Sequence, residues 1–223
     1  MSDSGYPFSV PTPTAVLISG GGRTLLNLQA EIDAGRLAVR IVQVITSSSK
    51  AAGNERATAI GLPVEVIPRG TCPDDATFSQ RVFECVTSAG AELVCLAGYL
   101  KFLPIPDHWL GRVINIHPAL LPDFGGQGMY GERVHRAVLA AGATESGCTV
   151  HFADNEYDHG PVIVQQRCRV EPGETADTLA QRVFACECEA YPEAIRRLQR
   201  GQVVYRPESG HAGAADLQGR DDR

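Results

Sequence analysis

The chain lacks a long hydrophobic run. Its longest apolar stretch, residues 93–103, is interrupted by Gly98, Tyr99 and Lys101, and it falls well short of the roughly 18 apolar residues that span a bilayer. The first fourteen residues contain no basic cluster, and their apolar residues are too scattered for a secretory signal. These absences predict a protein that does not enter a membrane and that resides in the cytoplasm.

An excess of basic residues is also missing. The 223 residues include 20 lysines and arginines against 26 aspartates and glutamates, which gives a formal net charge of -6. A surface for nucleic acid or anionic membrane needs a basic face, so neither partner is expected. A small anionic substrate, held by a few local donors, is still compatible with this charge. The sequence leaves the oligomeric state open, a homodimer included.

Neither paired cysteines nor metal-ligand spacings are found. Seven cysteines are an odd number in a chain long enough for a sizeable core, and Cys95 and Cys148 lie within apolar runs. Cys186 and Cys188 are two positions apart in an expected helix, where their side chains point to different sides. No second pair follows at zinc spacing. The sequence therefore predicts reduced, buried thiols in a cytosol and no metal site.

Strand and helix patterns alternate along the first half of the chain. Short apolar or β-branched runs predict strands at residues 15–19, 39–46, 62–68, 92–98 and 112–117. Apolar residues at helical spacing predict helices between them, at residues 24–35, 50–61 and 74–90. Because parallel neighbours need crossover connections, this alternation predicts an α/β fold with a mostly parallel sheet and helices on both faces.

The second half changes character. A helix near 132–141 precedes two strands, at 148–154 and 161–170, which a short polar segment joins into an antiparallel extension of the sheet. A final helix is expected over 174–200. No internal repeat is visible, so we predict a single domain over residues 15–205. Polar segments without an apolar period predict flexible tails at residues 1–14 and 206–223.

A glycine-rich loop, Ser-Gly-Gly-Gly-Arg-Thr at residues 19–24, connects the first strand to the first helix. Backbone N–H groups and the helix dipole at such a place can hold a phosphate. Gly21 and Gly22 would let the backbone approach the anion, Arg23 could add a bidentate contact, and Thr24 could cap the helix. The second strand lacks the acidic end of a dinucleotide fold, and no Gly-Lys-Ser/Thr follows the loop. A phosphate monoester therefore fits better than NAD or ATP, and a tight turn without a ligand is the alternative.

Asn115 and His117 lie two residues apart at the end of a predicted strand, so their side chains leave the same face. Pro118 then ends the strand. Ligands of open parallel sheets bind beyond the carboxyl ends of strands. An amide and an imidazole fixed there can both donate hydrogen bonds to an acyl-type oxygen that gains negative charge. A polar pair that merely finishes a strand is the alternative.

Asp158 lies in a turn-rich segment, Tyr-Asp-His-Gly-Pro, before a strong strand. Acidic residues at such positions often only form turns. The functional interpretation is that Asp158 raises the pKa of His117 and accepts a proton. The other histidines show no shared metal spacing and are expected to be structural or solvated; they are His108, His135, His151 and His159.

Several motifs together resemble one family. They are AVLISGGG near the start, LAGYLKFL, the stretch RVINIHPALLP, and GCTVHFAD followed by YDHGPVIVQ. Over about residues 15–205 the chain is similar to the phosphoribosylglycinamide formyltransferases, folate-dependent enzymes of purine biosynthesis. The resemblance implies a Rossmann-like sheet and, as co-substrate, 10-formyltetrahydrofolate.

The resemblance also implies roles for individual residues. Asn115 and His117 match residues that stabilise a tetrahedral intermediate, and Asp158 matches an aspartate that keeps the histidine charged. The glycine loop matches the phosphate site of the ribonucleotide, and Glu187 matches an acid near its ribose. The positions that match the folate-binding walls are Leu100, Lys101, Phe102, Leu103 and Asp154.

Two other functions stay open at this point. A formyltetrahydrofolate hydrolase would use water in place of the amine and would need no phosphate loop. A non-catalytic protein that binds a phosphate metabolite would keep the glycine loop but would tolerate the loss of His117.

Overall fold

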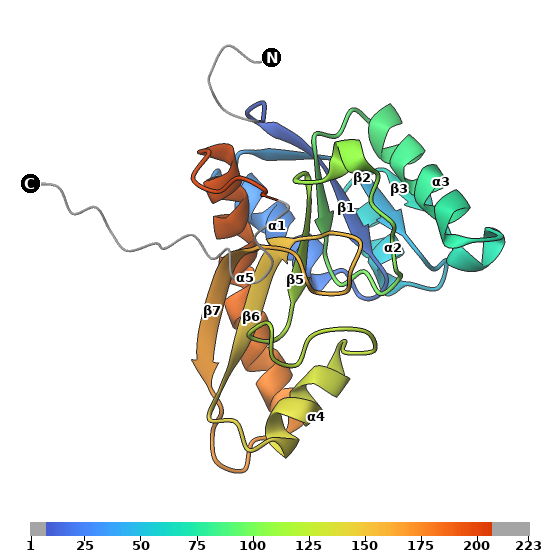
Figure 1. Cartoon of the computed structure of the whole chain (residues 1–223). Coiled ribbons are helices and arrows are strands. Elements are labelled where there is room, and N and C mark those ends of the chain that lie inside the picture. Colours follow the sequence, from blue (N-terminus) through green and yellow to red (C-terminus); the bar gives the residue numbers. More distant parts are fainter. Residues whose placement is uncertain (1–7, 207–223) are drawn as a thin grey trace, which may run out of the picture.

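The computed structural model describes residues 8–206. Seven strands form one mixed sheet in the order β3-β2-β1-β4-β5-β6-β7 (Figure 1). The strands are β1 Thr12–Ile18, β2 Val39–Thr46, β3 Val64–Val66, β4 Leu93–Leu96, β5 Val113–His117, β6 Glu145–Phe152 and β7 Val162–Arg169. The first five run parallel to one another, whereas β6 pairs antiparallel with β5 and with β7. The predicted α/β fold with an antiparallel C-terminal extension is confirmed.

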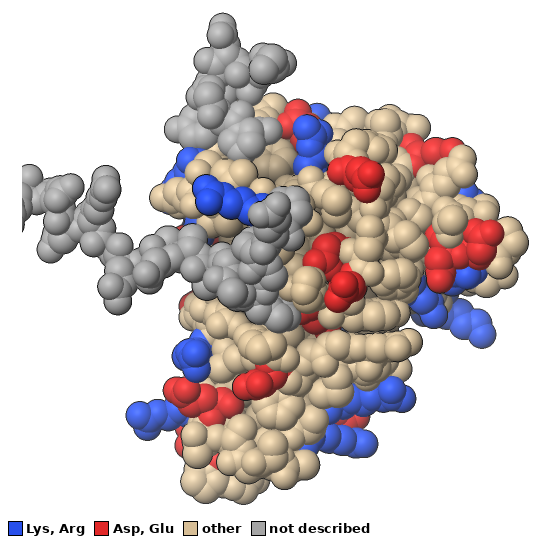
Figure 2. All heavy atoms as spheres, in the orientation of Figure 1, with Lys and Arg blue, Asp and Glu red and all other residues tan. Residues whose placement is uncertain are grey.

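Five α-helices and two short 3-10 helices connect the strands within the described residues. They are α1 Arg23–Asp33, α2 Ala52–Ala59, η1 Arg69–Thr71, α3 Asp75–Ser88, η2 Asp107–Trp109, α4 Glu132–Ala140 and α5 Ala176–Gln199. None of these helices is long and apolar enough to cross a membrane. On the face drawn in Figure 2, most of the visible surface is uncharged, and acidic and basic side chains are scattered over it.

The sheet has a hydrophobic core on each face, because its central strands carry apolar residues at successive positions. From β1, Val16 and Ile18 join the core formed with α1 and α5, while Ala15 and Leu17 join the core formed with α3. All four of these side chains are fully buried. The strand is therefore anchored from both sides, and the loop that follows it is held in place.

The predicted flexible segment 1–14 is wrong for residues 8–14. Strand β1 begins at Thr12, Phe8 is only 5% exposed, and the amide and hydroxyl of Ser9 donate to the carboxylate of Glu92 at 2.7 and 2.6 Å. A single buried aromatic ring and one acid at a distant position order this segment, although its local composition is polar. Residues 1–7 and 207–223 lie outside the described part of the chain.

The strand order reverses between β1 and β4, because the chain leaves β1 toward β2 but returns to the other side of β1 as β4. Open parallel sheets bind ligands outside the carboxyl ends of their strands at such a switch point. The glycine loop after β1, the 97–105 loop after β4 and the end of β5 are therefore neighbours at one edge of the sheet. This edge is where the predicted site residues meet.

Candidate active site

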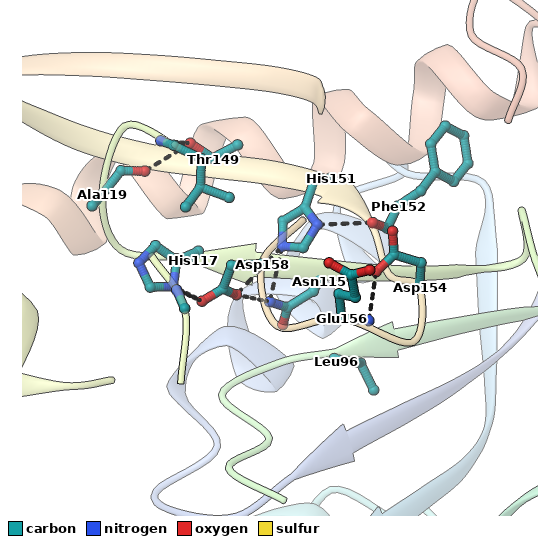
Figure 3. A network of polar contacts seen from close by, with 12 residues as sticks. Leu96, Asn115, His117, Ala119, Thr149, His151, Phe152, Asp154, Glu156 and Asp158 are labelled. Atoms are coloured by element: carbon teal, nitrogen blue, oxygen red, sulfur yellow. Dashed lines mark hydrogen bonds and ion pairs between the residues drawn. The ribbon is translucent and has the colours of Figure 1, made fainter. Parts of the chain in front are cut away.

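Asp158 lies between Asn115 and His117, and it contacts both of them (Figure 3). Its Oδ2 is 3.3 Å from Nδ1 of His117, and its Oδ1 accepts a hydrogen bond of 3.3 Å from Nδ2 of Asn115. The side chain of His117 is 4% exposed and that of Asp158 is 11% exposed. The structure thus brings together the three residues that the sequence placed on a strand end and in a loop some forty positions later.

His151 of β6 is a fourth polar member of this cluster. It lies opposite Asn115 in the β5–β6 ladder, and its Nδ1 is 2.8 Å from the carbonyl oxygen of Phe152. Because a carbonyl oxygen only accepts, this Nδ1 carries the proton. The other ring nitrogen, Nε2, is then free to accept from Nδ2 of Asn115 at 3.1 Å. His151 therefore fixes the orientation of the Asn115 amide.

His117 uses both of its ring nitrogens within the protein. Its Nε2 donates to the carbonyl oxygen of Phe124 at 2.9 Å, while Nδ1 faces Asp158. Phe124 has a φ of 57°, an uncommon value for a residue with a bulky side chain. An oxygen acceptor thus already lies against the imidazole, which shows where an acceptor oxygen of a ligand could bind.

Burial and charge act in opposite directions on this pair. Burial lowers the pKa of His117, and the carboxylate of Asp158 and the carbonyl of Phe124 oppose that shift. For Asp158, burial raises the pKa, but His117 and the N–H of Gly126 hold it below its ordinary value. The expected effect of Asp158 on His117 is present, yet the net pKa of His117 is lowered. Asp158 thus raises the pKa of His117 as predicted, but burial outweighs this effect.

The loop that carries Asp158 has an unusual backbone. Asp158 has a φ of 53°, in the left-handed region that aspartate tolerates better than most residues. A Cβ at Gly160 would overlap the carbonyl oxygen of Phe152, so only glycine allows this close approach to β6. The amide of Gly126 donates to Oδ2 of Asp158 at 3.0 Å. Loop geometry and one backbone donor therefore place the carboxylate.

Thr149 holds the turn that follows His117. It faces His117 across the β5–β6 ladder, and its hydroxyl donates to the carbonyl of Ala119 at 2.7 Å. The same oxygen accepts from the amide of Leu121 at 3.0 Å. Gln165 on β7 donates to the carbonyl of Leu121 at 2.7 Å. Strands β6 and β7 therefore fix the direction in which the chain leaves β5.

One cavity of about 320 Å³ is lined by every residue that the sequence predicted for the site. Its lining includes Gly21, Gly22, Arg23, Thr24, Leu100, Lys101, Phe102, Leu103, Asn115, His117, Asp154, Asp158 and Glu187. The predicted phosphate side and the predicted folate side open into the same space, with the cluster around Asp158 between them. In residues 8–206, no group of three or more His, Cys, Asp or Glu side chains could hold a metal ion.

The glycine loop differs in detail from the prediction. Gly22, with a φ of 70°, is the N-cap of α1, and the helix begins at Arg23. The predicted cap by Thr24 is wrong, since that residue lies inside the first turn. The guanidinium of Arg23 stacks 4.2 Å from the ring centroid of Phe184. Burial raises the pKa of Glu187 to about 7, and the charge of Arg23 opposes this shift.

Two loops form another wall of the cavity, and Asn155 of one loop is hydrogen-bonded to the backbone of Ile105 in the other. Its Oδ1 accepts from the amide of Ile105 at 2.7 Å, and its Nδ2 donates to the carbonyl of the same residue at 3.2 Å. Phe102 and Tyr157 pack with ring centroids 5.0 Å apart. Apolar and aromatic walls of this kind suit a flat aromatic ligand.

Two residues were missed as site residues, His135 and His151, which the sequence analysis expected to be structural or solvated. Both line the cavity, and they are 5% and 2% exposed. For His151 the signal is its position opposite Asn115, which becomes visible only with the register of β6. For His135 the helical pattern of α4 shows a buried position but not what lies beside it.

Comparisons with known proteins agree with this geometry. The formyl transferase family matches residues 13–195. The chain is 36% identical over 197 residues to the chloroplastic phosphoribosylglycinamide formyltransferase of Arabidopsis thaliana, which covers 87% of this chain and 68% of the plant protein. It is 38% identical over 194 residues to the trifunctional purine biosynthetic protein adenosine-3 of Bos taurus, of which it spans 18%.

Solved structures show the same similarity. Glycinamide ribonucleotide transformylase 1 of Symbiobacterium toebii superposes with a TM-score of 0.81 at 35% identity, over 88% of this chain and 91% of that one. The phosphoribosylglycinamide formyltransferase of Coxiella burnetii gives a TM-score of 0.80 at 36% identity, over 88% and 90% of the two chains. The chain therefore belongs to the formyl transferase family, as its motifs predicted.

Proposed function

We propose that this protein is a phosphoribosylglycinamide formyltransferase, which transfers the formyl group of 10-formyltetrahydrofolate to the amine of glycinamide ribonucleotide in purine biosynthesis. The observation that carries the proposal is the contact of Asp158 with both Asn115 and His117 in one cavity. Relatives with these names cover most of the chain. The other activities of the trifunctional relatives are not part of the proposal.

The two substrates would enter from opposite sides of the cavity. The apolar wall around Phe102 and Tyr157 suits the pterin of the folate. The start of α1, with Arg23 beside it, suits the phosphate of the ribonucleotide. The amine and the formyl carbon then meet beside His117, so that positioning contributes to the rate.

The reaction is an acyl transfer without a covalent enzyme intermediate. The amine nitrogen attacks the formyl carbon, whose oxygen gains negative charge; the bond from that carbon to the folate nitrogen then breaks. The amine loses one proton and the folate nitrogen gains one. Asp158, whose pKa is below its ordinary value, is the ionised group that can take the amine proton, directly or through water.

Stabilisation of the developing oxyanion requires an exchange of hydrogen bonds. Nδ2 of Asn115 donates to His151 and Asp158, and the contact to Asp158 is the longer one. Nε2 of His117 donates to the carbonyl of Phe124. The formyl oxygen would replace Asp158 at the amide and Phe124 at the imidazole. Negative charge on that oxygen would also raise the pKa of His117 and oppose the effect of burial.

The experiment is an assay of purified protein with glycinamide ribonucleotide and 10-formyltetrahydrofolate, with and without the amine. Amine-dependent formation of the formylated product is expected for the wild type. Asn115→Ala, His117→Ala and Asp158→Ala should each lower kcat by about 100-fold or more, with unfolding transitions near that of the wild type. The control His108→Ala, at a histidine outside the cavity, should keep full activity.

Release of tetrahydrofolate without the amine would identify a hydrolase instead. Binding of the ribonucleotide with no turnover, together with unchanged binding in His117→Ala, would identify a non-catalytic protein. The cytoplasmic location, the single domain over residues 15–205 and a homodimer stay predictions. The plant relative carries the description chloroplastic, so localisation of the tagged protein in its own cells is the test of the compartment.

A further inference from the structure

His135 is a buried histidine, and one nitrogen of its ring has no hydrogen-bond partner in the described part of the protein. It lies on α4 between the core residue Val134 and the exposed Arg136. The residue is 5% exposed, and it lines the cavity. Its Nδ1 is inaccessible and has no hydrogen-bond partner among residues 8–206. Buried polar groups nearly always have a partner, so the described part of the chain leaves this ring without the hydrogen bond that would hold it in place.

The surroundings of His135 suit an anion. Burial lowers its pKa, and His117 and Arg23 lower it further, while Glu132 on the same helix opposes them. Glu132 itself is paired with Arg136 at 2.6 Å. Arg23, His117 and the first turn of α1 line the same cavity as His135.

The beginning of α1 is not capped by the protein. Its N-cap Gly22 makes no side-chain cap hydrogen bond, and the first turn contains no acidic residue. The first intrahelical bond runs from the amide of Leu26 to the carbonyl of Gly22 at 3.0 Å, so the preceding amides have no acceptor within the helix. A phosphate needs several donors on different sides, and the helix terminus supplies them from one side only.

We propose that His135 binds the phosphate of the ribonucleotide together with Arg23 and the start of α1, which line the same cavity. This assignment rests on the proposed function for the identity of the phosphate-bearing acceptor. The hydrogen bond to a phosphate oxygen would come from Nε2, since Nδ1 is inaccessible. His135 is then a binding residue for the acceptor substrate, with no part in the transfer of the formyl group.

The test compares two acceptors that differ only in the phosphate, glycinamide ribonucleotide and the corresponding riboside. In His135→Leu, kcat/KM for the ribonucleotide should fall about 10- to 100-fold, the loss of one hydrogen bond to a charged group. With the riboside the same variant should stay within about 3-fold of the wild type. The KM for the folate should not change, and His135→Gln, which restores a donor, should recover part of the loss.

The matched control is Val138→Ala, a core position on the same helix that does not line the cavity. It loosens α4 without touching the ring, so it should affect both acceptors equally. Equal losses for the two acceptors in His135→Leu, or no loss with the ribonucleotide, would overturn the assignment. This comparison is made within one variant, so it stays valid if that variant is less stable.

Inorganic phosphate gives a readout that does not depend on turnover. We expect it to bind the wild type, observed by phosphorus NMR, and to bind His135→Leu at least 10-fold more weakly. Unchanged phosphate affinity would also refute the role of His135. If the wild type binds phosphate but transfers no formyl group to either acceptor, the proposed function fails while the phosphate site is still tested.

Discussion

Replacing Glu187 with glutamine should stabilise the protein at alkaline pH while it weakens binding of the ribonucleotide. Glu187 lies on α5 and lines the cavity, where burial raises its pKa to about 7 against the opposing charge of Arg23. A carboxylate kept there is an ionised group in an unfavourable place. We expect the ribose hydroxyls of the proposed acceptor to donate hydrogen bonds to this carboxylate.

The sign of the effect follows from the two pKa values. Below the unfolded value of 4.5, the carboxyl is protonated in both states and costs nothing. Between pH 4.5 and about 7, the unfolded chain ionises while the folded protein keeps its proton, so stability falls as the pH rises. Above that pH window the full loss of stability caused by the raised pKa remains. At about 1.4 kcal/mol for each pH unit it amounts to roughly 3 kcal/mol, and because the side chain still reaches the cavity we expect about 2 kcal/mol.

The assay is urea unfolding of the wild type and Glu187→Gln at pH 5, 6, 7 and 8. The variant should exceed the wild type by less than about 1 kcal/mol at pH 5 and by about 2 kcal/mol at pH 8. Glu189→Gln is the control, since that side chain is exposed on the same helix and should give no gain that grows with pH. A stability difference between Glu187→Gln and the wild type that does not vary with pH, or a less stable variant at pH 8, would refute the reasoning.

Two further predictions concern residues that support the site. Asn155→Ala removes both hydrogen bonds to the backbone of Ile105, so the KM for the folate should rise several-fold while the KM for the acceptor stays the same. Steady-state kinetics in which each substrate is varied in turn will check this. Equal increases in the two KM values would contradict the prediction. Tyr191→Phe removes a buried hydroxyl that donates toward the carbonyls of Leu96 and Ile114 at 3.0 and 3.2 Å. The free energy of unfolding should therefore fall by about 1–3 kcal/mol. An unchanged urea midpoint would contradict this prediction.

Much of the fold could be predicted from the sequence because local patterns and topology agree. The strand at 39–46 matches β2 residue for residue, since a β-branched run between turn signals has one interpretation. The N-terminal segment could not be predicted in the same way. Its order depends on Phe8 and on the pairing of Ser9 with Glu92, a contact across more than eighty positions that no local pattern contains.

The positions of site residues could be predicted from the sequence where they lie on one strand. They could not be predicted where they depend on the register between two paired strands. Asn115 and His117 share a face of β5 because they are two residues apart. His151 joins them only through the β5–β6 register, in which it pairs with Asn115. A shift of that register by one residue would turn His151 to the other face. Its role therefore became visible only with the paired strands.

The position of Asp158 shows why the loop after β6 has its geometry. Strand β6 runs antiparallel to β5 and ends beside the beginning of that strand, where the amide of Ala153 donates to the carbonyl of Val113 at 2.9 Å. Asp158 nevertheless contacts His117, the last residue of β5, so the loop must turn back along the strand it has just passed. A positive φ at Asp158 and a glycine packed against β6 at position 160 allow that reversal. The loop is thus built to deliver one carboxylate, and changes to its backbone should lower catalysis more than they lower the stability of the sheet.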